Sequence, residues 1–115
     1  MVDDEPLVRR AITMMLVYLG YSVETAQDGY AALELFNRDK FDLVMTDLSM
    51  PEMPGDQLAA RIRQLVPSQK IIMVTAFAEE YRKSGMGNID ALLDKPFTLV
   101  DLRGAIEQAL ARGSK

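Results

Sequence analysis

The sequence contains no cysteine and no histidine. Their absence excludes disulfide bonds, the usual zinc sites, and nucleophilic catalysis by Ser–His or Cys–His pairs. The longest apolar stretches are too short to span a bilayer, and the opening residues Met-Val-Asp-Asp-Glu lack the basic and apolar regions of a signal peptide. We therefore expect a cytoplasmic protein that does not enter a membrane.

A basic run is also missing. Lys and Arg number 13 against 17 Asp and Glu, which gives a formal net charge of −4. Without a stripe of positive charge to contact phosphates, the chain is not expected to bind DNA or RNA directly. The 115 residues are 49% hydrophobic and 26% charged, which is typical of a globular protein, so we expect a single domain over residues 1–115.

Four apolar runs have the length of strands. They are Tyr21–Ala26, Phe41–Thr46, Lys70–Thr75 and Ala91–Leu93. The second and third runs are almost continuously apolar, which indicates strands buried on both faces. Because helical segments separate the runs, the pattern favours an α/β domain with a parallel sheet and helices on both faces.

The segments between the runs have apolar residues at helical spacing. They predict helices from Pro6 to near Gly20, around Ala32–Phe36, from Asp56 to before Pro67, and after Pro96. Thr98 and Asp101 at the start of the last helix resemble a capping box. The segment Ala78–Asn88 contains three Ser or Gly residues and few apolar ones, so it predicts only a short helix.

The start of the sheet is unusual. A first strand should precede Asp3, but only Met1 and Val2 lie before it. At about 3.3 Å per residue, two residues cover roughly 7 Å of a sheet. Such a truncation is expected to destabilise the fold, because it leaves backbone groups of the sheet without partners.

Polar residues stand at the ends of the predicted strands, where parallel α/β sheets place their ligands. These residues are Asp3, Asp4, Asp47, Thr75 and Lys95. Three neighbouring carboxylates repel one another unless a cation lies among them, and oxygen ligands without His or Cys favour Mg²⁺, with Mn²⁺ also suitable. A carboxylate can also act as a nucleophile and form an aspartyl phosphate, whose charge a metal and an ammonium neutralise.

Four motifs carry a resemblance to a known family. They are Val2-Asp3-Asp4-Glu5, the segment Val44-Met45-Thr46-Asp47-Leu48-Ser49-Met50-Pro51 with Gly55, Val74-Thr75-Ala76, and Asp94-Lys95-Pro96-Phe97. In order and spacing they resemble the receiver domain of response regulators in two-component signal transduction systems. The resemblance covers nearly the whole chain. It implies a flavodoxin-like, doubly wound fold with five parallel strands in the order 2-1-3-4-5.

The resemblance also implies a role for each acidic residue. Asp47 would be the phosphoacceptor of an Mg²⁺-dependent switch. Asp4 would bind the metal directly, Asp3 would hold a metal-bound water, and the backbone carbonyl of Ser49 would complete the protein ligands. The phosphoryl donor would be a sensor histidine kinase or a histidine phosphotransfer protein.

Other residues take roles in the switch by the same resemblance. Thr75 would be the hydroxyl that moves onto the phosphoryl group, and Lys95, followed by a cis bond to Pro96, would be the counter-cation. Ser49 and Phe77 occupy positions that tune the lifetime of the phosphoryl group, and a bulky Phe77 is expected to shield it from water.

The domain would catalyse its own phosphoryl transfer and dephosphorylation without being an enzyme for other substrates. It would act on an unknown downstream target, as a monomer or as a phosphorylation-linked homodimer.

Simpler explanations exist for single residues. Asp3 and Asp4 suit a helix N-terminus, and Asp47 suits a turn. Leu92 stands where the family usually has Tyr or Phe, which favours an alternative in which the domain is a phosphorylation-independent docking module. A second alternative is a hydrolase of small phosphoesters, but such enzymes typically have Asp where this chain has Ser49.

Overall fold

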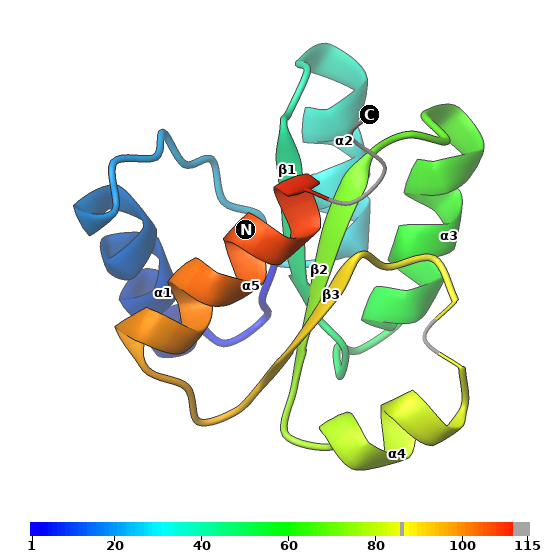
Figure 1. The fold of residues 1–115 in the computed structure, drawn as a ribbon. Helices are drawn as coiled ribbons and strands as arrows, with labels where there is room; N and C mark the ends of the chain where they lie inside the picture. The colour runs from blue at the N-terminus through cyan, green and yellow to red at the C-terminus, as the bar shows by residue number, and fades with distance from the viewer. Residues whose placement is uncertain (86, 112–115) are drawn as a thin grey trace.

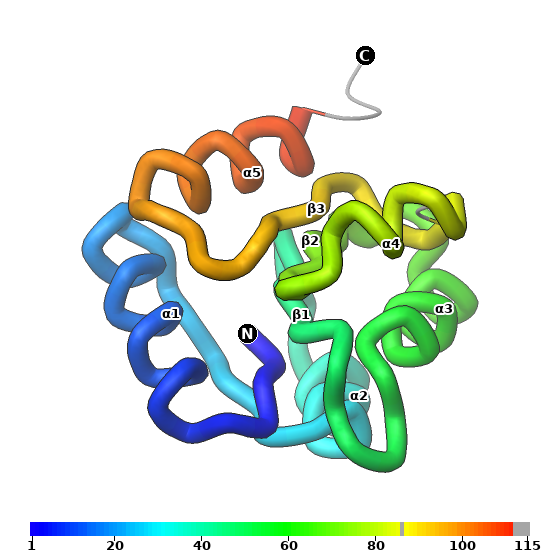
Figure 2. The backbone as a smooth tube through the Cα atoms, turned by 90° about the horizontal axis from the view of Figure 1, so that it is seen from below, coloured from blue at the N-terminus to red at the C-terminus, as the bar shows by residue number. Residues whose placement is uncertain are grey.

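The computed structural model describes residues 1–85 and 87–111, which form a layered α/β domain. One parallel sheet contains the strands β1 (Leu43–Asp47), β2 (Lys70–Thr75) and β3 (Ala91–Asp94), in that order. The helices of the described residues are α1 (Pro6–Tyr18), α2 (Gly29–Arg38), α3 (Gly55–Leu65), α4 (Ala78–Lys83) and α5 (Leu99–Ala111). Helices α1 and α5 cover one face of the sheet, α2 and α3 cover the other, and α4 lies beside β3 (Figure 1, Figure 2).

The central strand β2 shows why the sheet is buried on both faces. Its side chains alternate, so Ile71 and Met73 pack with α2 and α3, while Ile72 and Val74 pack with α1 and α5. All four side chains are completely buried. Each contributes about 1.5–3 kcal/mol relative to an exposed side chain. The prediction of strands buried on both faces is therefore confirmed for β2.

Local sequence signals set the helix starts. The carboxylate of Asp28 accepts a hydrogen bond of 2.8 Å from the Ala31 N–H and begins α2. Before α5, the Thr98 N–H donates to Asp101 Oδ2 at 3.0 Å, and the Asp101 N–H donates to Thr98 Oγ1 at 3.1 Å. The capping box is thus confirmed, and so is the short helix α4, which has six residues. No helix within the described residues combines the length and the apolar character that a bilayer span requires.

The expected five-stranded sheet is present only in part. The prediction of a strand over Tyr21–Ala26 is wrong, because only Ala26 of that run forms a bridge, to Val2. Val2 also bridges Thr46, in the parallel sense. The physical reason is that Val2 alone bridges to this run, and a single bridge does not make a continuous ladder.

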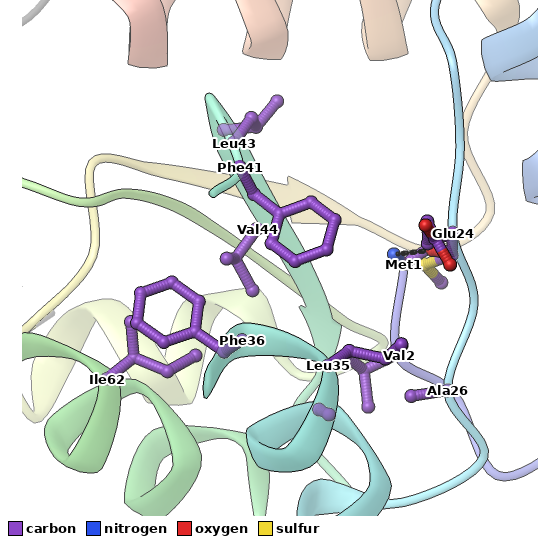
Figure 3. Close-up of a pocket in the computed structure, with 11 residues that line it drawn as sticks. Met1, Val2, Glu24, Ala26, Leu35, Phe36, Phe41, Leu43, Val44 and Ile62 are labelled. Carbon is purple, nitrogen blue, oxygen red and sulfur yellow. Dashed lines mark hydrogen bonds between the residues drawn. The ribbon is translucent and has the colours of Figure 1, made fainter. Parts of the chain in front are cut away.

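Backbone hydrogen bonds nonetheless fix Val2 next to β1. The Val2 N–H donates to Met45 O at 2.8 Å, and the Asp47 N–H donates to Val2 O at 2.9 Å. A small apolar pocket of about 40 Å³ opens beside this segment. Figure 3 shows Met1 and Val2 on one side of the pocket and the rings of Phe36 and Phe41 on the other. The hydrogen bonds of Val2 therefore hold the neighbouring Asp3 next to the end of β1.

Candidate functional site

The strand register brings the predicted site residues to one end of the sheet. Asp47 ends β1 opposite Val74, and Thr75 ends β2 opposite Asp94. Lys95 follows β3, and its backbone N–H donates to Thr75 O at 2.9 Å. Val2 is hydrogen-bonded to Met45 and to Asp47 of β1 and runs parallel to that strand. Asp3 and Asp4 follow Val2, so they lie at the same end of the sheet as Asp47.

The three carboxylates form a tight cluster. One oxygen from each of Asp3, Asp4 and Asp47 lies within 4.8 Å of the others. Asp3 is completely buried, and its Oδ1 accepts a hydrogen bond of 2.9 Å from the Glu5 N–H. Its Oδ2 is buried too, with no hydrogen-bond partner in the described part of the chain. Burying a carboxylate oxygen without a partner costs folding free energy. A hard divalent cation would be a suitable partner, because the donor atoms of this cluster are all oxygens.

Lys95 supplies the positive charge of the site. Its Nζ donates to Asp47 Oδ1 at 2.9 Å and lies 3.8 Å from Asp3 Oδ2. The side chain is 28% exposed, so the ammonium sits at the boundary between the buried carboxylates and solvent. The peptide bond from Lys95 to Pro96 is cis, as the family resemblance implied.

The ionisation of Asp47 reflects these neighbours. Burial raises the pKa of the Asp47 carboxyl above its usual value, and the nearby Asp3 and Asp4 charges raise it further. The hydrogen bond and the charge of Lys95 act in the opposite direction and lower the pKa. Lys95 therefore opposes the effect of burial on the pKa of Asp47.

The loop after β1 is held tightly next to Asp47. The Leu48 N–H donates to Val74 O at 2.9 Å, and the Gly55 N–H donates to Leu48 O at 2.8 Å. A Cβ at Gly55 would collide with the carbonyl oxygen of Asp47 and would lie 2.9 Å from Met73 Sδ. Ser49 lies in this loop and is exposed. Only glycine allows the start of α3 to approach β1 this closely.

Thr75 lies on the other side of Asp47 from the acidic pair in the strand order. It is buried, and its Oγ1 accepts a hydrogen bond of 2.9 Å from the Phe77 N–H, which leaves the hydroxyl proton available to donate. The Phe77 side chain is 59% exposed. Leu92 is half-buried and packs, together with Tyr81, against the core between the sheet and helices α2 and α3.

The structure adds one residue that sequence reasoning missed. The Arg9 Nη1 donates a hydrogen bond of 2.7 Å to the backbone carbonyl of Asp3. An arginine near the start of a helix is usually a solvent-exposed residue, and its spacing from Asp3 corresponds to no motif that we identified. Only the three-dimensional contact connects it with the site.

Comparison with known proteins decides the family. The family model of the response regulator receiver domain matches residues 1–107. The chain belongs to this family. The receiver domain is 40% identical over 112 residues to the sensor histidine kinase RcsC of Salmonella typhi, which covers 96% of this chain and 11% of that protein. It is 35% identical over 113 residues to the response regulator MprA of Mycobacterium leprae, which covers 96% of this chain and 50% of that protein.

Solved structures agree with this assignment of the receiver domain. The response regulator TrrA from Thermotoga maritima, in complex with Mg²⁺–BeF, superposes with a TM-score of 0.87 at 34% identity, over 95% of each chain. A receiver domain protein from Clostridium thermocellum also gives a TM-score of 0.87, at 28% identity over 96% of this chain and 91% of that one. The flavodoxin-like fold class is confirmed, whereas the described strands show only the order β1-β2-β3.

Proposed function

We propose that this receiver domain is a phosphorylation-dependent switch that accepts a phosphoryl group on Asp47 from a sensor histidine kinase or a histidine phosphotransfer protein. One observation carries the proposal. The Asp47 carboxylate accepts a hydrogen bond of 2.9 Å from the Lys95 ammonium and lies within 4.8 Å of the acidic pair Asp3 and Asp4. A carboxylate nucleophile, a cation for the charge that develops, and a candidate metal site are thus gathered at one end of the sheet.

In the proposed reaction, one Asp47 oxygen forms a bond to phosphorus. The P–N bond of the donor phosphohistidine breaks, and its electron pair remains on the imidazole nitrogen. Lys95 neutralises charge on the transferred group, and the Thr75 hydroxyl donates a hydrogen bond to a phosphoryl oxygen. Dephosphorylation is the attack of water on the same acyl phosphate, so the domain catalyses both steps on itself.

The residues present fit a divalent cation. Asp3 and Asp4 would hold Mg²⁺, or Mn²⁺, together with Asp47 and the backbone carbonyl of Ser49. When bound, such a cation supplies charge neutralisation for the phosphoryl oxygens. The Mg²⁺–BeF complex of TrrA supports this assignment by similarity.

Phosphorylation would act through the end of the sheet that holds Thr75. Movement of its hydroxyl onto the phosphoryl group breaks the hydrogen bond from the Phe77 N–H and releases the start of α4. A downstream partner that binds this side better in one state then shifts the balance between the two states.

The proposal is tested with acetyl phosphate and intact mass. We expect the wild-type protein to gain one phosphoryl group when Mg²⁺ is present and none when EDTA replaces it. A folded protein that gains none with Mg²⁺ would support the alternative, a phosphorylation-independent docking module. Leu92 favours that alternative, because it is half-buried where the family usually has an aromatic switch residue.

Replacing Phe77 is expected to shorten the life of the phosphoryl group. We expect Phe77→Glu to dephosphorylate faster than the wild type, because the change removes an apolar ring near the site and adds a carboxylate that can orient water. The measurement is the decay of phosphorylated protein after removal of the donor. Tyr30→Glu is the matched control, because Tyr30 is also an exposed aromatic residue but lies on α2. Its phosphoryl group should decay at the wild-type rate. Equal decay of Phe77→Glu and wild type would contradict the shielding role.

A further inference from the structure

Arg9 closes a circuit of hydrogen bonds that begins and ends on Asp3. The Glu5 N–H donates to Asp3 Oδ1 at 2.9 Å, and the Arg9 N–H donates to Glu5 O at 2.9 Å. The Arg9 guanidinium then returns to Asp3 and donates from Nη1 to its backbone carbonyl at 2.7 Å. Two of these hydrogen bonds tie the start of α1 to Asp3, and the third is the helical bond from Arg9 to the N-cap residue Glu5.

The carbonyl that Arg9 binds belongs to the peptide bond between Asp3 and Asp4. Because a peptide group is planar, holding its oxygen restricts both ψ of Asp3 and φ of Asp4. Those two angles set the direction in which the Asp4 side chain leaves the backbone. Arg9 therefore acts on the carboxylate cluster through the backbone, while its own hydrogen bond goes to a carbonyl and not to a carboxylate of the cluster.

We infer that Arg9 is a positioning residue that sets the Mg²⁺ affinity of the receiver domain by orienting the Asp3–Asp4 peptide. The inference rests on the proposed function, in which this cluster binds a divalent cation. Residues that orient metal ligands typically change metal affinity by roughly 10- to 100-fold when they are replaced. Arg9 is suited to this role because hydrogen bonds from charged donors are stronger than neutral ones.

Simple electrostatics predicts the opposite effect. Arg9 brings a positive charge next to Asp3, and removal of that charge should strengthen the binding of another cation. A weaker affinity for Mg²⁺ in a variant without the guanidinium therefore cannot arise from charge. It would report the loss of orientation, which is the inferred role.

The experiment is a calorimetric titration of the full chain with MgCl₂ at constant ionic strength, which measures the affinity for Mg²⁺. We expect Arg9→Gln to bind Mg²⁺ at least about tenfold more weakly than the wild type. Arg9→Lys keeps the positive charge but replaces the guanidinium with a compact ammonium. Its Mg²⁺ affinity should therefore lie between those of Arg9→Gln and the wild type. Arg10→Gln is the matched control, because Arg10 is the next residue of α1 and its side chain is exposed. Its affinity should equal that of the wild type.

Circular dichroism in EDTA first establishes that each variant folds. An affinity of Arg9→Gln equal to or tighter than wild type would overturn the inference and leave the proposed function standing. If Arg9→Gln does not fold, Arg9→Lys decides, and an affinity equal to wild type would overturn the inference. A wild-type protein that binds no Mg²⁺ would overturn the proposed function as well.

Discussion

Gly55→Ala is expected to lower the free energy of unfolding by about 3 kcal/mol or more, at the upper end of the cost of overpacking a buried site. An added methyl group would meet the backbone carbonyl of Asp47, which cannot rotate away as a side chain can. Either α3 moves away from β1 or the Asp47 peptide tilts, and both change the surroundings of Asp47, the proposed phosphoacceptor. Chemical denaturation measures the stability, and phosphorylation by acetyl phosphate measures the site.

Gly104→Ala is the matched control for this substitution. Gly104 lies in α5, and nothing lies within 4 Å of the position that its Cβ would take. Alanine is favoured over glycine inside a helix, so this variant should gain about 0.5–1 kcal/mol of stability. If Gly55→Ala were as stable and as readily phosphorylated as Gly104→Ala, the close approach of α3 to Asp47 would have no functional importance.

Lys95→Met is expected to slow phosphorylation of Asp47 by about 10²- to 10³-fold, the usual effect of removing one group that stabilises charge in a transition state. Lys95 also lowers the pKa of Asp47, which burial raises. Without the ammonium that pKa rises further, so a higher pH is needed to ionise the nucleophile. The measurement is the rate of phosphorylation by acetyl phosphate as a function of pH.

The direction of the pH effect distinguishes this role from a general loss of activity. The acid side of the rate profile should move to higher pH in Lys95→Met, while the profile of Lys40→Met, at an exposed lysine before β1, should match the wild type. A Lys95→Met protein with an unshifted profile and a normal rate would show that Lys95 does not neutralise Asp47 during transfer.

The sequence contained enough information for the sheet that carries the site. The apolar run Lys70–Thr75 coincides with β2, because a strand buried on both faces needs apolar side chains at nearly every position. The run Tyr21–Ala26 was also predicted as a strand, but it is more polar, with Ser22, Glu24 and Thr25, and it is not a strand. Whether a run pairs depends on its neighbour, and here the neighbouring segment bridges to the run through Val2 alone. Local composition contains no information about that partner.

The candidate site was largely predictable because its residues stand at strand ends in the sequence. Asp3, Asp4, Asp47 and Lys95 could be placed together from the direction of the strands alone. The contact of Arg9 with the Asp3 carbonyl could not be, because it depends on how α1 turns back over the loop before it. Gly55 was noticed in the sequence only as part of the family motif. The structure explains why a glycine is needed there, because a Cβ at this position would meet the Asp47 carbonyl.

The most direct test of the central claim is to locate the phosphoryl group after incubation with acetyl phosphate and Mg²⁺. We predict that intact mass shows one added phosphoryl group on the wild type and on Asp42→Asn, at an exposed carboxylate just before β1, and none on Asp47→Asn. Circular dichroism establishes that the three proteins are equally folded. Phosphorylation of Asp47→Asn to the wild-type extent would contradict the account, because the acceptor would then be a different residue.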